Sequence, residues 1–193
     1  MSDRPVKLIL ASQSPRRREL LSAAGYDFEV RPPLPSAESG LKSGESPAEF
    51  VARLAYQKAA DVAGRIDAGL VLACDTVAEC DGRILGKPDD EEHARTMLAS
   101  LSGRKHRVLS GICLWQVPDG RPVVRVAETT LRMDMLSDEQ IDRYLAGGAW
   151  KGKAGAFGYQ DRLGWVHVLE GSESNVVGLP MELLAEMLAK PCP

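Results

Sequence analysis

The chain has 193 residues, of which 44% are hydrophobic and 26% charged, and its formal net charge is −3. This is the composition of a globular protein and excludes a globally disordered one, and the length favours a single domain over residues 1–193. Without an excess of basic residues the chain is not expected to bind a nucleic acid polymer, so an anionic ligand has to be met by a local cluster of cations.

The first apolar run, at residues 8–11, is far too short for the core of a signal peptide or for a membrane span. The cysteines form no C-x-x-C pair and have neither the spacing of a disulfide framework nor that of a zinc site. They are Cys74, Cys80, Cys113 and Cys192. We therefore expect reduced, mostly buried thiols in a cytoplasmic protein that has no membrane partner.

In chain order, the first half is predicted to contain a strand at 6–11, a helix at 15–24, a strand at 27–31, a loop at 32–46, a helix at 47–64, strands at 70–74, 76–80 and 83–85, and a helix at 89–101. Ser14 is a candidate N-cap that precedes a proline, and Ser46 and Glu49 form a capping box. Asp81-Gly82 is a strong signal for a hairpin.

The second half continues with strands at 105–117 and 123–135, a helix at 138–146, an irregular glycine-rich segment at 147–160, a strand at 165–169 and a helix at 180–189. Pro118-Asp119-Gly120 joins the two long strands, which we expect to form a protruding antiparallel hairpin. Strands mixed with helices predict an α/β fold with a mixed sheet flanked by helices.

The turn at 12–17, between the first strand and the first helix, is a candidate phosphate site. A helix N-terminus presents free N–H groups and a partial positive charge, and the hydroxyls of Ser12 and Ser14 add further donors. The guanidinium groups of Arg16 and Arg17 can each form bidentate contacts with phosphate. The same residues are also typical of an ordinary capped helix with solvated arginines.

Asp75-Thr76 follows a predicted strand, and ligands of α/β proteins bind at the carboxyl ends of strands. A carboxylate there can hold a hard cation or orient a water, although a turn or cap aspartate would have the same pattern. Lys87, between Gly86 and Pro88, is either a phosphate ligand or a solvated turn lysine. The pattern of a P-loop, G-x-x-x-x-G-K-[ST], does not occur.

Glycines in the segment that ends at Gln160 let the backbone approach a ligand closely, although a flexible surface loop has the same composition. Within it, Lys153 adds charge, and Gln160 offers a donor and an acceptor for the edge of a base. Residues 175–180 are more typical of packing or capping than of a site. Taken alone, Lys58 in the second helix and Glu38 in the long loop would be interpreted as solvated. No local signature supports a Ser/His/Asp or Cys/His nucleophile.

These pieces occur in one order along nearly the whole chain, and that order resembles the Maf family of nucleotide pyrophosphatases. The matching stretches are L-A-S-x-S-P-R-R-x-x-L-L at 10–21, R-L-A-x-x-K-A at 53–59, D-T-V at 75–77, G-K-P at 86–88, A-x-x-M-L-x-x-L-S-G-x-x-H-x-V at 94–108, K-A-G-A-F-G-x-Q at 153–160 and N-V-V-G-L-P at 175–180. No single stretch is decisive, but their succession is specific.

The resemblance implies an elongated mixed sheet with helices and two lobes around a deep cleft, a fold shared with inosine triphosphatase-like proteins. It implies hydrolysis of a nucleoside triphosphate between the α- and β-phosphorus, with Mg²⁺ or Mn²⁺ as cofactor, and homodimers are common in the family. Asp75 is the expected general base, and Asp75 and Glu38 are the expected metal ligands. The expected substrate ligands are Ser12, Ser14, Arg16, Arg17, Lys58, Thr76, Lys87, Lys153 and Gln160.

Arg17, Thr76 and Gln160 match the branch of the family that prefers dTTP and UTP, whereas another branch prefers 7-methyl-GTP. Gly152 stands where the family often has an aspartate, so a carboxylate that would support the metal or a lysine is missing there. Glu173 stands where the family has a tyrosine. The alternatives are a 7-methyl-GTP, ITP or XTP pyrophosphatase and a non-enzymatic nucleotide-binding regulator of cell division. Modified pyrimidine nucleotides would fit as well as dTTP or UTP.

Overall fold

The computed structural model describes residues 6–190. Its centre is a seven-stranded mixed sheet with the strand order β2-β1-β3-β5-β6-β7, and β4 pairs with β3 outside this order. The strands are β1 (Leu8–Leu10), β2 (Phe28–Val30), β3 (Gly69–Cys80), β4 (Arg83–Leu85), β5 (Lys105–Val117), β6 (Val123–Met133) and β7 (Val166–Glu170). β1 runs parallel to β2 and β3, and the other neighbours are antiparallel. The helices are α1 (Pro15–Ala23), α2 (Pro47–Ala63), α3 (Glu91–Leu101), α4 (Asp138–Ala146), α5 (Glu173–Val177) and α6 (Met181–Leu188), with 3₁₀ turns at Pro35–Ala37, Ala154–Ala156 and Tyr159–Asp161.

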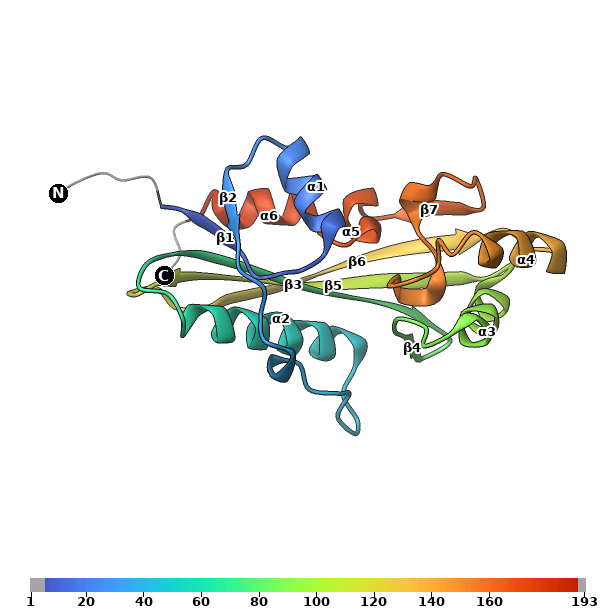
Figure 1. The fold of residues 1–193 in the computed structure, drawn as a ribbon, viewed down its shortest axis with the longest axis horizontal. Helices are drawn as coiled ribbons and strands as arrows, with labels where there is room; N and C mark the ends of the chain where they lie inside the picture. Colours follow the sequence, from blue (N-terminus) through green and yellow to red (C-terminus); the bar gives the residue numbers. More distant parts are fainter. Residues whose placement is uncertain (1–5, 191–193) are drawn as a thin grey trace.

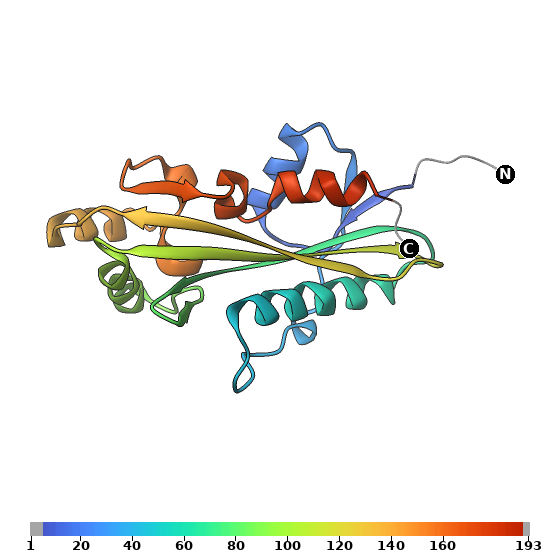
Figure 2. The ribbon, with the colours of Figure 1, turned by 180° about the vertical axis from the view of Figure 1, so that it is seen from behind.

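Helices cover both faces of the elongated sheet (Figure 1 and Figure 2). α2 lies along one face, α1, α5 and α6 lie on the other, and α3 and α4 gather at the end that also carries β4 and β7. Separate groups of buried apolar side chains fill the layer beneath α2, the layer beneath α1 and α6, and the lobe around α3 and α4. The predicted fold class is therefore confirmed. No helix between residues 6 and 190 is long and apolar enough to cross a membrane.

The side chains of β3 alternate between the two faces, as the pleat of a strand requires. Ala73 packs in the apolar group beneath α2, whereas Cys74 packs beneath α1 and α6. By the same alternation, Asp75 points toward α2 and Thr76 points toward the opposite face. The side chains of the adjacent residues Asp75 and Thr76 therefore lie on opposite faces of the sheet.

One edge of β3 is interrupted near the middle of the strand. β1 pairs with β3 as far as Leu72 and β4 pairs with it from Ala78, so no described strand pairs with this edge in between. On the other edge β5 pairs with β3 without a break, and Gly111 lies opposite Asp75. The interruption separates the lobe that contains α1 and α6 from the lobe that contains α3 and α4.

α2 approaches the sheet closely at Gly111. A Cβ atom at this position would lie 2.3 Å from the carbonyl oxygen of Val51, so a side chain here would displace the helix. Lys58 lies about two turns further along α2. The close contact at Gly111 therefore sets how near Lys58 comes to β3.

Several signals that act over a few residues predict the structure correctly. Capping boxes form at Ser46 and Ser137, and the β3–β4 turn has positive φ at Asp81 and Gly82, at 50° and 78°. Ser14 occupies the N-cap position of α1, but its side chain makes no capping hydrogen bond. Of the cysteines, Cys74, Cys80 and Cys113 are buried, as expected, and Cys192 lies outside the described residues.

Two expectations about strands are wrong. The strands predicted at 70–74 and 76–80 form one strand, β3, because the backbone of Asp75 and Thr76 stays paired with β5. Asp75 therefore lies within a strand and not after its end. The two long strands do not protrude as a separate hairpin, because β5 lies between β3 and β6 in the sheet and is largely buried. In addition, α5 is a short helix that the sequence pattern does not predict.

Candidate active site

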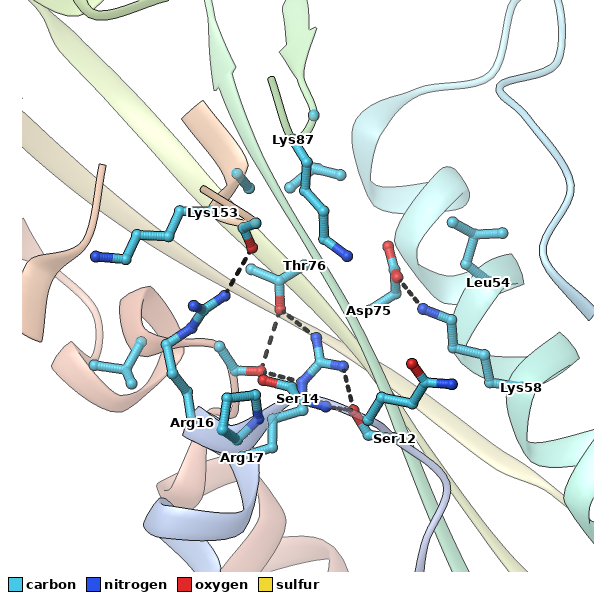
Figure 3. Close-up of a pocket in the computed structure, with 18 of the residues that line it drawn as sticks. Ser12, Ser14, Arg16, Arg17, Leu54, Lys58, Asp75, Thr76, Lys87 and Lys153 are labelled. Carbon is cyan, nitrogen blue, oxygen red and sulfur yellow. Dashed lines mark hydrogen bonds and ion pairs between the residues drawn. The ribbon is translucent and has the colours of Figure 1, made fainter. Parts of the chain in front are cut away.

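A cavity of about 680 Å³ lies at the interrupted edge of β3 (Figure 3). It is lined by the β1–α1 turn, the loop before α2, α2, β3, the turn after β4, the glycine-rich segment and the end of α5. All the predicted ligands of substrate and metal line it, namely Ser12, Ser14, Arg16, Arg17, Glu38, Lys58, Asp75, Thr76, Lys87, Lys153 and Gln160. The fold thus brings side chains from distant segments to one place.

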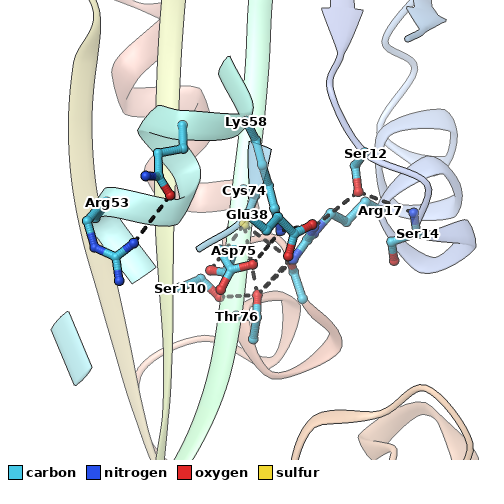
Figure 4. Close-up of polar contacts among 12 residues, drawn as sticks. Ser12, Ser14, Arg17, Glu38, Arg53, Lys58, Cys74, Asp75, Thr76 and Ser110 are labelled. Atoms are coloured by element: carbon cyan, nitrogen blue, oxygen red, sulfur yellow. Dashed lines mark hydrogen bonds and ion pairs between the residues drawn. The ribbon is translucent and has the colours of Figure 1, made fainter. Parts of the chain in front are cut away.

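A buried ion pair forms the part of the cavity between β3 and α2 (Figure 4). The Lys58 Nζ atom lies 2.5 Å from Asp75 Oδ1 and 3.2 Å from Glu38 Oε1. Lys58 and Asp75 are 7% and 8% exposed, whereas half of the Glu38 side chain is exposed. No described residue donates a hydrogen bond to Asp75 Oδ2, so this oxygen can accept one from water or bind a cation.

The meeting of Lys58 and Asp75 follows from two periodicities. Lys58 lies on the buried face of α2, where Leu54, Ala55 and Ala59 recur at helical spacing. Asp75 lies on the α2 side of β3 because side chains alternate along a strand. The charged pair is therefore placed between elements that pack together through their apolar residues.

Arg53, also on α2, holds the loop that carries Glu38. Its guanidinium group donates to both carboxylate oxygens of Glu45 at 2.6 and 2.7 Å, to Ser39 Oγ at 2.5 Å and to the Gly40 carbonyl at 3.0 Å. The hydrogen bonds from Arg53 lower the pKa of Glu45 to about 2. We refer to these contacts of Arg53 with Glu45, Ser39 and Gly40 as the loop latch.

Arg17 is buried and connects three segments around the cavity. Its Nε atom donates to the Gly178 carbonyl at 2.8 Å, Nη1 donates to Ser12 Oγ at 3.0 Å and Nη2 donates to Thr76 Oγ1 at 3.2 Å (Figure 4). Thr76 Oγ1 also lies 2.8 Å from Ser110 Oγ. Arg17 therefore orients the hydroxyls of Ser12 and Thr76 at the cavity and is itself largely enclosed.

Arg16 and Lys87 supply positive charge at the open side of the cavity. Arg16 Nη2 donates to the Gly152 carbonyl at 3.1 Å, and burial together with repulsion by Arg17 lowers the pKa of Arg16. Lys87 extends its ammonium group toward Asp75 without an ion-pair partner among the described residues (Figure 3). A polyanionic ligand would relieve the mutual repulsion of these cations.

Lys153 lines the cavity, but its ammonium group is already paired. Nζ lies 2.6 and 2.5 Å from the two carboxylate oxygens of Asp161, and the side chain points away from Lys87 and Asp75 (Figure 3). Gln160, the residue before Asp161, is exposed and lines the cavity. This orientation of Lys153 does not support the direct phosphate contact that we predict for it.

Glu38 and Asp75 are the residues in the cavity that fit a divalent cation. Both carboxylates lie beside one cationic group, the ammonium of Lys58, so the site already favours positive charge. Mg²⁺ is usually bound by one or two carboxylates together with water and substrate phosphates. Accordingly, residues 6–190 contain no cluster of three or more His, Cys, Asp or Glu side chains that could hold a metal alone.

Five residues shape the site without having been predicted to do so: Arg53, Ser110, Tyr144, Asp161 and Gly178. Ser110 could have been noticed as a polar residue in an apolar strand, and Arg53 as a residue five positions before Lys58 on one helix. Gly178 lies in the segment that we expect to be structural, and its carbonyl has that role. No local signal identifies Tyr144 and Asp161, since their contact depends on the path of the glycine-rich segment.

Comparisons with known proteins agree with this architecture. A protein from Rhodopirellula baltica named dTTP/UTP pyrophosphatase is 59% identical over 97% of this chain and 83% of its own. A protein of the same name from Novosphingobium aromaticivorans is 47% identical over 91% of this chain and 87% of its own. A solved HAM1 protein from Coxiella burnetii shares the fold, with a TM-score of 0.51 and 16% identity over 96% of this chain and 100% of the other. A family model described as Maf-like protein matches residues 7–191, and the chain therefore belongs to this family.

Proposed function

We propose that the chain hydrolyses dTTP and UTP to the monophosphate and pyrophosphate. The observation that carries this proposal is the convergence of Arg16, Lys58 and Lys87 around Asp75 in one cavity. Phosphoryl transfer needs mainly positioning and neutralisation of charge, and these cations supply both along a triphosphate. The dTTP/UTP pyrophosphatases to which the chain is similar support the same activity.

Asp75 is the proposed general base. Its Oδ2 atom accepts a proton from water as the water oxygen bonds to the α-phosphorus and the bond from that phosphorus to the bridging oxygen breaks. The bridging oxygen leaves with pyrophosphate, whose negative charge Lys87 and Arg16 stabilise. Lys58 holds Asp75 in place through the 2.5 Å contact with Oδ1. Ser12 and the N-terminus of α1 donate to the remaining phosphate oxygens.

Glu38 and Asp75 are the proposed ligands of Mg²⁺ or Mn²⁺. When bound, such a cation would neutralise charge on the phosphate oxygens and make a nearby water easier to deprotonate. The loop latch on Arg53 keeps Glu38 within reach of Lys58 and Asp75, so the chain itself determines the separation of the two carboxylates.

Replacement of Asp75 tests this assignment. Asp75→Asn keeps the shape of the side chain but removes the base, and we expect release of pyrophosphate from dTTP to fall at least about a hundredfold. Glu79→Gln is the matched control, because Glu79 is a buried acid of the same strand, 5% exposed, that pairs with Arg107 and does not line the cavity. Full turnover by a folded Asp75→Asn variant would show that Asp75 is not the base.

Selection of the nucleobase is assigned to Gln160. Thr76 adds a small polar contact to the nucleobase, and Arg17 orients Thr76. The edge of uracil or thymine carries two carbonyls and one N–H, and an amide side chain can match this pattern. A panel of dTTP, UTP, dGTP, 7-methyl-GTP and ITP, each with Mg²⁺ or Mn²⁺, tests the preference. Faster hydrolysis of the purine nucleotides would contradict this preference, and binding without hydrolysis would favour a nucleotide-binding regulator.

The cytoplasmic location and the homodimer expected from the sequence stay predictions.

A further inference from the structure

The ion pair between Lys153 and Asp161 lies at the edge of the cavity and has no part in the proposed chemistry. Their side chains are only 11% and 19% exposed. The hydroxyl of Tyr144 donates to Asp161 Oδ2 at 3.0 Å. Burial, reinforced by the charge of Asp161, raises the pKa of Tyr144 well above its usual value, so the hydroxyl keeps its proton and remains a donor. Asp161 thus accepts from two partners that have little access to water.

The ion pair lies directly beside the amide of Gln160. A Cβ atom added to Gly158 would lie 2.5 Å from Lys153 Nζ, 2.8 Å from Asp161 Oδ2 and 2.8 Å from Gln160 Nε2. The three polar groups therefore gather around one glycine. Asp161 is also bonded to Gln160 in the chain, so its side chain fixes the backbone at the base-selecting residue.

The start of the same segment is held by independent contacts. The N–H of Gly155 donates to the Gly86 carbonyl at 3.0 Å, and Arg16 Nη2 donates to the Gly152 carbonyl at 3.1 Å. These contacts tie residues 152–155 to the phosphate-binding side of the cavity. The end of the segment, at Gln160, is held by the pair between Lys153 and Asp161, by Tyr144, and by the hydrogen bond from the Tyr159 hydroxyl to Glu173 Oε1 at 2.9 Å.

We propose that Asp161, supported by Tyr144, is a positioning residue that anchors Lys153 and thereby holds Gln160 in the orientation that selects the base. Lys153 then serves base selection through Asp161 and is not a phosphate ligand. This inference rests on the proposed role of Gln160. It explains why a lysine that lines the cavity turns away from Asp75 and Lys87.

Asp161→Asn removes the charge and keeps the size of the side chain. The buried ammonium of Lys153 then lacks a counter-charge and leaves its place, which releases Gln160. We expect the ratio of kcat/KM for dTTP to kcat/KM for dGTP to fall roughly tenfold, since a base is selected by placed hydrogen-bonding groups. The KM for dTTP should rise more than kcat falls, because the groups around Asp75 stay in place.

The experiment compares Asp161→Asn, Lys153→Met and their double variant with Gln160→Leu. Asp142→Asn is the matched control. Asp142 lies on α4, the helix that also carries Tyr144, and the variant removes its exposed ion pair with Arg95 on α3. If Asp161 and Lys153 act as a unit, both single variants and the double variant lose the same selectivity. Hydrogen exchange of the amides at 156–161 should accelerate in Asp161→Asn and stay unchanged in Asp142→Asn.

Three results would overturn the inference. Unchanged selectivity in Asp161→Asn, with lost selectivity in Gln160→Leu, would refute the positioning role and leave the proposed function intact. Unchanged selectivity in Gln160→Leu would refute the role of Gln160 itself. An equal loss of turnover on dTTP and dGTP in Lys153→Met, additive with Asp161→Asn, would show that Lys153 binds phosphate.

Discussion

His106 is a buried histidine at the start of β5, and neither ring nitrogen has a hydrogen-bond partner among the described residues. The residue is 3% exposed, and its ring lies edge-on to Phe157 with the centroids 5.5 Å apart. Burial lowers the pKa of His106 to about 4, because a charged imidazolium would lose its hydration there. We predict that His106→Leu makes the folded protein more resistant to mild acid.

The sign and size of the effect follow from proton uptake. An unfolded histidine has a pKa of about 6.5, so between pH 6.5 and 4 the unfolded chain binds a proton that the folded chain does not bind. The free energy of unfolding therefore falls as the pH falls through this range and levels off below the folded pKa. With a folded pKa of about 4 for His106, the loss between pH 7 and pH 5 is about 2 kcal/mol, and the full loss is about 3 kcal/mol.

The assay is urea unfolding of the wild type and of His106→Leu at pH 7, 6 and 5. The free energy of unfolding of the wild type should fall by about 2 kcal/mol more than that of the variant between pH 7 and 5. His93→Gln is the control, because the His93 side chain is 42% exposed. Equal losses in the wild type and His106→Leu would refute the reasoning, since the acid sensitivity would then come from other groups.

Two further predictions concern α2 and the loop before it. Gly111→Ala should lower the free energy of unfolding by about 1–3 kcal/mol and slow release of pyrophosphate by moving Lys58, because its Cβ meets the backbone of α2. Gly147→Ala is the matched control, because a Cβ there meets no atom closer than 3.4 Å and the residue does not line the cavity. Equal stability of the two variants in urea unfolding would contradict the prediction. Arg53→Gln removes the contacts of the loop latch and should raise the Mg²⁺ concentration needed for half-maximal activity roughly tenfold. Proteolysis within residues 36–45 should also become faster. An unchanged Mg²⁺ requirement would show that the latch does not position the metal site.

Interactions within a few residues explain which elements could be predicted from the sequence. The capping boxes at Ser46 and Ser137 fix the starts of α2 and α4, and the turn at Asp81-Gly82 fixes the β3–β4 hairpin. These devices depend on side chains and glycines that are close in the chain. They determine the elements, but they carry no information about neighbours in the sheet.

The errors arise where pairing between distant segments overrides the local pattern. Asp75-Thr76 interrupts an apolar run and therefore predicts the end of a strand, but the backbone of Asp75 remains paired opposite Gly111. Likewise, the hairpin of β5 and β6 has a clear turn, and only its pairing with β3 places it inside the sheet. Strand neighbours are set by burial in the whole fold, which no short window of sequence contains.

At the candidate site, too, the sequence identifies the residues but not their contacts with distant segments. All the predicted site residues line the cavity, and each belongs to a matching stretch except Glu38, which lies in the loop before α2. The family pattern does not distinguish Lys87, whose ammonium reaches toward Asp75, from Lys153, whose ammonium is bound by Asp161. Burial and direction of a side chain depend on partners from other segments, and Asp161 lies outside the pattern.

The interrupted edge of β3 explains how adjacent residues can act on one ligand. Neighbouring side chains in a strand point to opposite faces, so Asp75 meets Lys58 on α2 while Thr76 meets Arg17 and Ser110 on the other side. In a sheet paired on both edges the backbone would separate the two faces, and a ligand could reach only one of them. Because no described strand covers this edge between Leu72 and Ala78, a single nucleotide can pass around it. In the proposed function, the missing strand partner would allow the phosphates to bind beside Asp75 on one face while the nucleobase binds the groups of the other.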